Sequence, residues 1–128
     1  MLSLAMQRVR QLGASTRASF LTGHFPDQRP QGEFDFAIIM GVMDYVTDVP
    51  NFLQGLRSVF KQRAVISFPS IHWFRTPFRK VRYELRRCPV YFYAASEIET
   101  LLQNAGIKNY RIIKIPGAGM DYFVCLSV

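Results

Sequence analysis

The residues best suited to chemistry in this sequence lie in one segment, residues 70–95, where aromatic and basic side chains accompany a histidine. His72 is the residue whose type best suits a general base, because an imidazole can accept a proton near neutral pH. Trp73 and Tyr93 add flat aromatic surfaces, and arginines beside them suit an anionic or planar ligand. The alternative is an amphipathic helix over about residues 75–87 whose arginines face water.

The positive charge of the chain is concentrated in the same segment. The net charge is +7, and residues 71–95 hold six arginine or lysine residues against one glutamate. Because the excess is local, nucleic acid is not the expected partner, although arginines interleaved with aromatics leave single-stranded RNA as an alternative. The cysteines, Cys88 and Cys125, lie far apart without metal-ligand spacing. We interpret both as thiols, Cys125 as a core residue, and expect no metal site.

Length and composition favour a single packed domain over residues 1–128. Hydrophobic residues make up 49% of the chain and charged residues 20%, which is typical of a globular protein and not of a disordered one. The longest apolar stretch, residues 36–43, is far shorter than the roughly 20 residues of a membrane helix. The first residues lack the apolar region and cleavage site of a signal peptide. A cytoplasmic location is therefore expected.

The elements that must position these residues begin with two apolar strands. The segment Phe34–Gly41 is apolar at both odd and even positions, which predicts a buried central strand of a parallel sheet. Asp48 is placed to cap a helix whose apolar stripe reaches Phe60. Residues 63–68 predict a second buried strand. Strand, helix and strand at this spacing indicate a parallel crossover.

The remaining segments predict two further helices and three shorter strands. A helix over residues 1–12, a weak strand at 18–21, a helix over 97–104 and two closing strands are expected; the last helix has Ser96 and Glu99 as its capping box. The closing strands, residues 111–115 and 122–126, are joined by a short turn and should be antiparallel. The predicted fold class is α/β, a partial doubly wound Rossmann-like sheet that is mostly parallel with an antiparallel C-terminal strand.

This succession resembles the C-terminal part of class I S-adenosylmethionine-dependent methyltransferases. Residues 34–46 are similar to the family's fourth strand and the loop after it, residues 63–69 to its fifth strand, and the closing pair to its sixth and seventh. The family's glycine-rich first loop, Asp/Glu-x-Gly-x-Gly, is absent, since the only Gly-x-Gly lies at residues 117–119. The resemblance therefore implies an N-terminally truncated domain whose cofactor loop comes from a part outside this sequence.

The resemblance also implies a cofactor, S-adenosylmethionine, and a partner, a small-molecule methyl acceptor. The residues that it places at the cofactor are Gly23, His24, Phe25, Met40, Gly41, Val42 and Tyr45. His24 stands where the family often has an acid that binds the adenine amino group, and a neutral imidazole can also accept that bond. Asp44, Trp73 and Tyr93 are assigned to the acceptor. Methyl transfer needs chiefly alignment and at most one base, for which His72 is the candidate.

A non-catalytic module that pairs an exposed sheet edge with a partner is the alternative function. In the family the first strand lies between the fourth and the third, so its loss would leave residues 34–41 as an apolar edge prone to self-association. Two arrangements are then open: residues 18–21 pair directly with this strand, or residues 1–33 pack loosely. We predict direct pairing.

Overall fold

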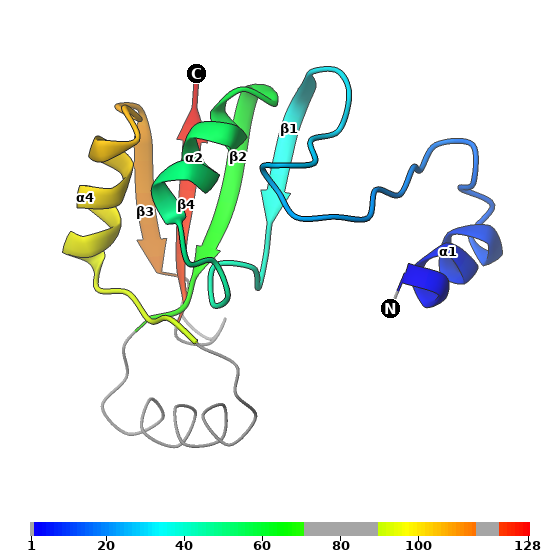
Figure 1. Cartoon of the computed structure of the whole chain (residues 1–128), viewed down its shortest axis with the longest axis horizontal. Coiled ribbons are helices and arrows are strands. Elements are labelled where there is room, and N and C mark those ends of the chain that lie inside the picture. Colours follow the sequence, from blue (N-terminus) through cyan, green and yellow to red (C-terminus); the bar gives the residue numbers. More distant parts are fainter. Residues whose placement is uncertain (1, 71–89, 115–120) are drawn as a thin grey trace. The chain divides into compact units, whose positions relative to one another are not determined.

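The chain divides into two compact units. The computed structural model describes residues 2–70, 90–114 and 121–128 (Figure 1). The first unit is Met1–Pro30 and the second is Gln31–Val128. The expectation of a single domain over the whole chain stays a prediction.

The first unit contains the helix α1, Leu2–Gln11, at the place predicted. Gly13 follows with φ of 64°, the left-handed backbone that ends many helices. The strand predicted at residues 18–21 is wrong, because these residues have no regular secondary structure. The direct pairing predicted between them and the strand at residue 34 would join the two units, and it stays a prediction. Four residues of mixed polarity lack the periodicity that would hold a strand without a paired neighbour.

The second unit is a four-stranded mixed sheet with the order β1-β2-β4-β3 (Figure 1). The strands are β1 (Phe34–Ile39), β2 (Phe60–Phe68), β3 (Tyr110–Lys114) and β4 (Tyr122–Ser127). β1 pairs with β2 in parallel, whereas β4 is antiparallel to both β2 and β3. The predicted α/β class, with its antiparallel C-terminal strand, is confirmed.

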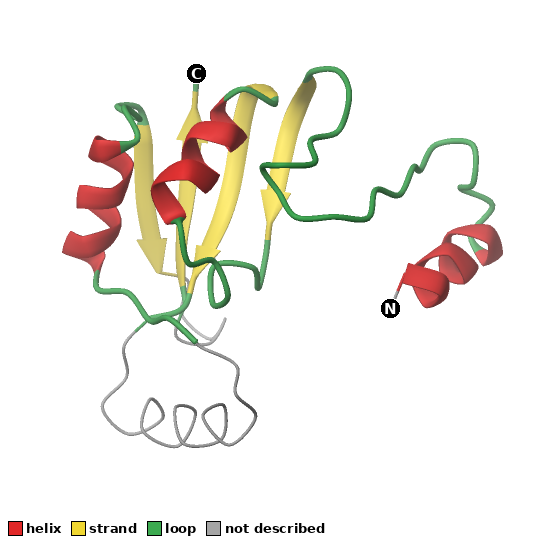
Figure 2. Ribbon diagram, viewed as in Figure 1, coloured by secondary structure: helices red, strands yellow, loops and turns green. Residues whose placement is uncertain are grey.

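The helices α2 (Val49–Arg57) and α4 (Ala95–Asn104) lie on the same face of this sheet (Figure 2). Asp48 caps α2 as predicted, because its carboxylate accepts a hydrogen bond from the Asn51 backbone N–H at 3.1 Å. The predicted cap of α4 is wrong by two residues. The Glu97 carboxylate accepts from the Ala94 N–H at 2.6 Å, so Ala94 precedes the helix and Ser96 lies inside its first turn.

The core lies between this helical layer and one face of the sheet. Apolar side chains of β2 and β4 alternate toward the helices and are fully or almost fully buried, as are those of α2 and α4 that meet them. These residues are Ala64, Ile66, Phe68, Val124 and Leu126 from the sheet and Leu53, Leu56, Ile98 and Leu102 from the helices. Cys125 points to the other face and is only half-buried, so its assignment to the core is wrong.

The prediction that residues 34–41 form a buried central strand is wrong in one respect. They form a strand, but β1 stands at the end of the sheet, and its only paired neighbour there is β2. Phe36 is 62% exposed and Ile38 is 75% exposed, whereas Ile39 faces α2 and is buried. The reason is that α2 and α4, the helices among the described residues of this unit, cover one face, and no described layer of this unit meets the alternate side chains of β1.

The N-cap of α2 can be tested by substitution. Replacing Asp48 with Ala removes the acceptor of the Asn51 N–H and should lower the free energy of unfolding by about 1 kcal/mol, measured by urea denaturation. Asp48→Asn is the matched control, because asparagine also caps helices and should retain most of the stability. An equal loss of unfolding free energy in the two variants would show that Asp48 does not stabilise the protein by capping α2.

Candidate functional site

The candidate site lies at the edge of the sheet where β1 and β2 both end. Because these strands are parallel, the loop after β1 and the residues after β2 leave from the same edge (Figure 1). In open α/β sheets, ligands bind beyond the carboxyl ends of parallel strands. The described residues at this edge are 40–48, 67–70 and 90–94.

Gly41 directs the chain out of β1. Its φ is 65°, and its N–H donates a hydrogen bond to the buried Ser67 Oγ at 3.0 Å. No heavy atom of the described residues lies within 4 Å of the place that a Cβ would occupy, so among them the glycine serves the backbone conformation and not close packing. Sequence reasoning missed Ser67, although a lone hydroxyl near the end of an apolar strand was the available signal.

Residues 91–93 are hydrogen-bonded to the loop after β1. The Tyr93 hydroxyl donates to the Met43 carbonyl at 3.2 Å, and the Tyr91 N–H donates to the Asp44 carbonyl at 2.9 Å. Met43 itself is fully buried, and Asp44 is 9% exposed. Two consecutive carbonyl groups of the loop are thus bound by one short segment, which fixes the path of the backbone between Gly41 and Tyr45.

Tyr93 is in turn fixed by β2 and the residues after it. Its ring meets the Phe68 ring edge to face at 5.2 Å, and its N–H donates to the Pro69 carbonyl at 2.9 Å. Burial raises the pKa of the Tyr93 phenol to about 12, with further contributions from Tyr91, Asp44 and Glu97. A tyrosine phenol is protonated at neutral pH, so the hydroxyl acts as a donor that positions the loop, and burial extends this state to more alkaline pH. Its predicted contact with a methyl acceptor stays a prediction.

Three side chains around Gly41 offer exposed apolar surface. Met40 is 47% exposed, Val42 38% and Tyr45 48%. A flexible thioether, a branched aliphatic group and an aromatic ring at one sheet edge suit the flat, weakly polar ring system of a ligand. Beside them, the backbone at Gly41 has free space in the direction of a missing Cβ.

The structure brings together only part of the predicted site. The residues that it places at one edge are Met40, Gly41, Val42, Asp44, Tyr45 and Tyr93. Gly23, His24 and Phe25 belong to the first unit, where the His24 carbonyl accepts from the Gln28 N–H at 2.8 Å. His72 and Trp73 lie outside the described residues, as do Cys88, the predicted helix at 75–87 and the turn at 116–119.

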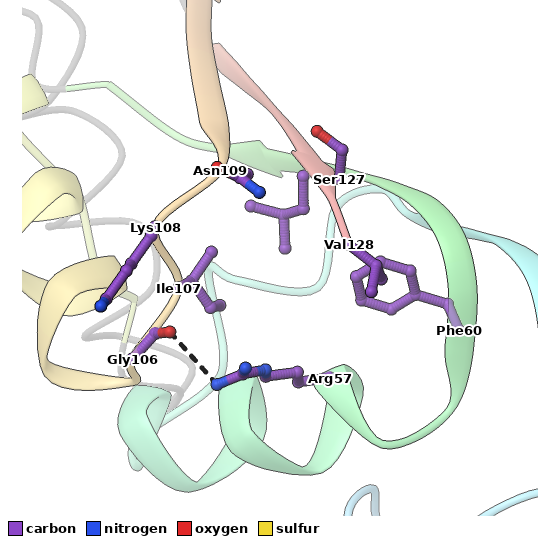
Figure 3. A pocket seen from close by; sticks show the side chains of 9 residues that line it. Arg57, Phe60, Gly106, Ile107, Lys108, Asn109, Ser127 and Val128 are labelled. Atoms are coloured by element: carbon purple, nitrogen blue, oxygen red, sulfur yellow. Dashed lines mark hydrogen bonds between the residues drawn. The ribbon is translucent and has the colours of Figure 1, made fainter.

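A cavity of about 280 Å³ lies at the opposite edge of the sheet (Figure 3). It is formed by the end of α2, the turn at residues 106–109, Phe60 and the C-terminal residues 126–128. The Arg57 guanidinium donates a hydrogen bond to the Gly106 carbonyl at 3.1 Å. This bond ties the end of α2 to the turn between α4 and β3. The cavity adjoins the amino ends of β2 and β3 and is remote from the edge where parallel strands bind ligands.

Two kinds of feature are not found in residues 2–70, 90–114 and 121–128. No group of three or more histidine, cysteine, aspartate or glutamate residues there could hold a metal ion. Of the helices within these ranges, none has the length and apolar character needed to cross a membrane.

Comparison with solved structures identifies the fold. The chain has the fold of the C-terminal part of class I S-adenosylmethionine-dependent methyltransferases. A Nostoc punctiforme protein provisionally described as an O-methyltransferase superposes with a TM-score of 0.76 at 15% identity, over 99% of this chain and 42% of its own. The mitomycin 7-O-methyltransferase MmcR gives 0.73 at 22% identity, over 97% of this chain and 38% of its own.

A third solved structure contains bound SAH. Magnesium protoporphyrin IX methyltransferase from Synechocystis, solved with bound SAH, gives a TM-score of 0.65 at 18% identity, over 98% of this chain and 57% of its own. The chain thus spans well under two thirds of the length of each of these structures. Neither a protein-family model nor a curated protein sequence matches it.

The raised pKa of Tyr93 predicts a dependence of stability on alkaline pH. Below about pH 10 the phenol is neutral in both the folded and the unfolded state, so its contribution is fully present. Between about 10 and 12 the unfolded chain ionises first, and stability is lost as pH rises. The unfolding free energy should fall by on the order of 1 to 3 kcal/mol more in the unmodified chain than in Tyr93→Phe.

Denaturation series from about pH 8 to 12 measure this difference. Tyr91→Phe is the matched control, because Tyr91 binds Asp44 through its backbone N–H and the substitution leaves that bond intact. If Tyr91→Phe changed the dependence of the unfolding free energy on alkaline pH as much as Tyr93→Phe, the attribution of that dependence to the Tyr93 phenol would be wrong.

The left-handed backbone of Gly41 gives a second test at this edge. Gly41→Ala should lower the free energy of unfolding by about 1 to 2 kcal/mol, because an L side chain is strained at this φ. Gly41→Asn should lose less, since asparagine adopts this conformation more readily. Urea denaturation midpoints compare the two variants, and an unchanged midpoint for Gly41→Ala would mean that the loop does not keep this backbone.

Proposed function

We propose that this chain is the C-terminal part of an S-adenosylmethionine-dependent methyltransferase that methylates a small molecule. The observation that carries the proposal is the parallel pair β1 and β2, whose shared carboxyl edge presents Gly41 between Met40 and Val42 within a methyltransferase fold. Solved neighbours include one bound to SAH and others named for small-molecule acceptors, which supports this cofactor and this class of acceptor.

The residues present fit one wall of a nucleoside site. Gly41 lets a ligand approach the backbone closely, because the direction of its missing Cβ is open. Met40, Val42 and Tyr45 would contact the flat base, and their exposed fractions leave that surface accessible. Gly23, His24 and Phe25 stay proposed cofactor contacts, with His24 as the acceptor of a hydrogen bond from the base.

The chain's own residues would act mainly by positioning. S-adenosylmethionine, when bound, supplies an electrophilic methyl group. Tyr93 and Tyr91 fix the loop that carries Asp44 and Tyr45, so that these side chains are held where cofactor and acceptor would meet. His72 is the proposed base for the acceptor's proton, and Trp73 a proposed acceptor contact. The rest of the cofactor site would come from a preceding part of the domain.

Calorimetric titration with S-adenosylmethionine tests the proposal. A version extended at its N-terminus through the upstream coding sequence should bind the cofactor, and Tyr45→Ala should weaken binding about fivefold, or about 1 kcal/mol, through loss of aromatic contact.

The control for this titration is Lys108→Ala, because Lys108 lies at the opposite edge of the sheet and its loss should leave the affinity unchanged. No binding by the extended version, or equal effects of Tyr45→Ala and Lys108→Ala, would count against a nucleoside site at this edge.

A further inference from the structure

The cavity at the edge of the sheet opposite the candidate site has a positively charged lining. Its volume is about 280 Å³, and it lies among the end of α2, the turn between α4 and β3, and residues 126–128 (Figure 3). Arg57 and Lys108 are the charged side chains that line it, and none of its lining residues, all of which are described, is an aspartate or a glutamate. Such a concave, cationic surface attracts anions.

The Arg57 guanidinium is fixed in position, yet most of its donors are not used. Its bond to the Gly106 carbonyl, at 3.1 Å, takes one of the five N–H groups that a guanidinium offers. Among residues 2–70, 90–114 and 121–128, neither Arg57 nor Lys108 forms an ion pair with a carboxylate. An anion that enters the cavity therefore meets a cation that the protein has positioned and has not neutralised.

Two further donors stand close to Arg57 in the lining. The Lys108 ammonium and the Arg57 guanidinium lie on either side of Gly106 in the view of Figure 3. The Asn109 amide points toward the middle of the same group of residues, and within the described part of the chain its side chain makes no hydrogen bond (Figure 3). Two cations and one amide match the double negative charge and the three terminal oxygens of a phosphate monoester.

The rest of the lining is apolar and suits an organic group next to that phosphate. Phe60, Ile107 and Leu126 are buried residues that form part of the wall, and Val128 lies beside the Phe60 ring (Figure 3). Pockets for drug-sized molecules have volumes of roughly 300–1,000 Å³, so this cavity suits a smaller compound. Inorganic phosphate would leave the apolar wall without a contact, whereas a phosphate ester with one ring would cover it.

We propose that this cavity binds a small phosphate monoester that carries an apolar group. Arg57, Lys108 and Asn109 hold the phosphate, and the apolar group lies against Phe60 and Ile107. The proposal goes beyond the proposed function and does not rest on it, because the cavity adjoins the amino ends of β2 and β3, whereas the proposed cofactor edge is at the carboxyl ends of β1 and β2.

Calorimetric titration of the 128-residue chain with phenyl phosphate tests the proposal. At about pH 7.5, where the phosphate is a dianion, the Kd should be about 1 mM or lower. Inorganic phosphate should bind at least about tenfold more weakly, because it buries no apolar surface. Benzoate should bind at least about fivefold more weakly, because it has the same ring but one charge and two oxygens.

Substitutions in the lining locate the binding. Lys108→Ala should weaken phenyl phosphate binding about fivefold, and Arg57→Met about tenfold, because each removes a charged donor to the phosphate. Arg57→Met also removes the bond to Gly106, so thermal unfolding must show that this variant folds. Lys108→Ala breaks no such bond and keeps the test decisive. Arg111→Ala is the matched control, because Arg111 is an exposed cation of β3 outside the lining.

The proposal predicts a definite set of results, and three others would overturn it. Lowering the pH from about 7.5 to about 5 should weaken binding, because the second pKa of a phosphate monoester is about 6. No binding at about 10 mM phenyl phosphate, or an affinity that neither Lys108→Ala nor Arg57→Met changes, would reject the site. An equal loss in Arg111→Ala would show non-specific attraction to the net charge. Benzoate that binds as tightly as phenyl phosphate would reject the phosphate ester as the ligand class.

Lys108→Ala also separates this proposal from the proposed function. In the titration with S-adenosylmethionine it should leave the affinity unchanged, whereas here it should weaken binding. Binding of phenyl phosphate that depends on Lys108, together with no cofactor binding by the extended version, upholds the cavity and rejects the enzyme. Cofactor binding without phenyl phosphate binding rejects the cavity and upholds the enzyme.

Discussion

The parallel ladder between β1 and β2 is the constraint on which the candidate site depends. Its register, with Ala37 opposite Ala64 and Ile39 opposite Ile66, brings the ends of the two strands to one edge. From there the Gly41 N–H reaches Ser67 Oγ, which ties the loop after β1 to β2. An antiparallel pair would have sent the two chain exits to opposite edges, and no shared binding edge would exist.

Tyr93 fixes a third segment, residues 90–94, at the same edge of the sheet. Its ring packs on Phe68, its N–H binds Pro69 and its hydroxyl binds the Met43 carbonyl. The same burial that makes these contacts possible raises the pKa of the phenol, so the donor form persists to higher pH than in an exposed tyrosine.

Within the described residues of the second unit, the helices pack on one face of the sheet, and this asymmetry follows from the strands that they connect. α2 and α4 each connect strands of this unit, and both pack on the side of Ile66 and Val124. The other side keeps an apolar surface of the kind that cores contain, exposed at Phe36 and Ile38.

The sequence by itself determined the local elements of the second unit. Apolar periodicity and the Asp48 cap predicted β1, α2 and β2, and the short spacing of the last two strands predicted their antiparallel pairing, because these signals act between residues close in the chain. Only the tertiary structure decided that β1 is an edge strand and that Tyr93 binds Met43. The apolar pattern of residues 34–41 indicates that side chains on both faces of the strand can be buried. It does not indicate whether another strand or helix covers them. That neighbour, like the Tyr93 contact 50 positions away, depends on distant segments meeting in space.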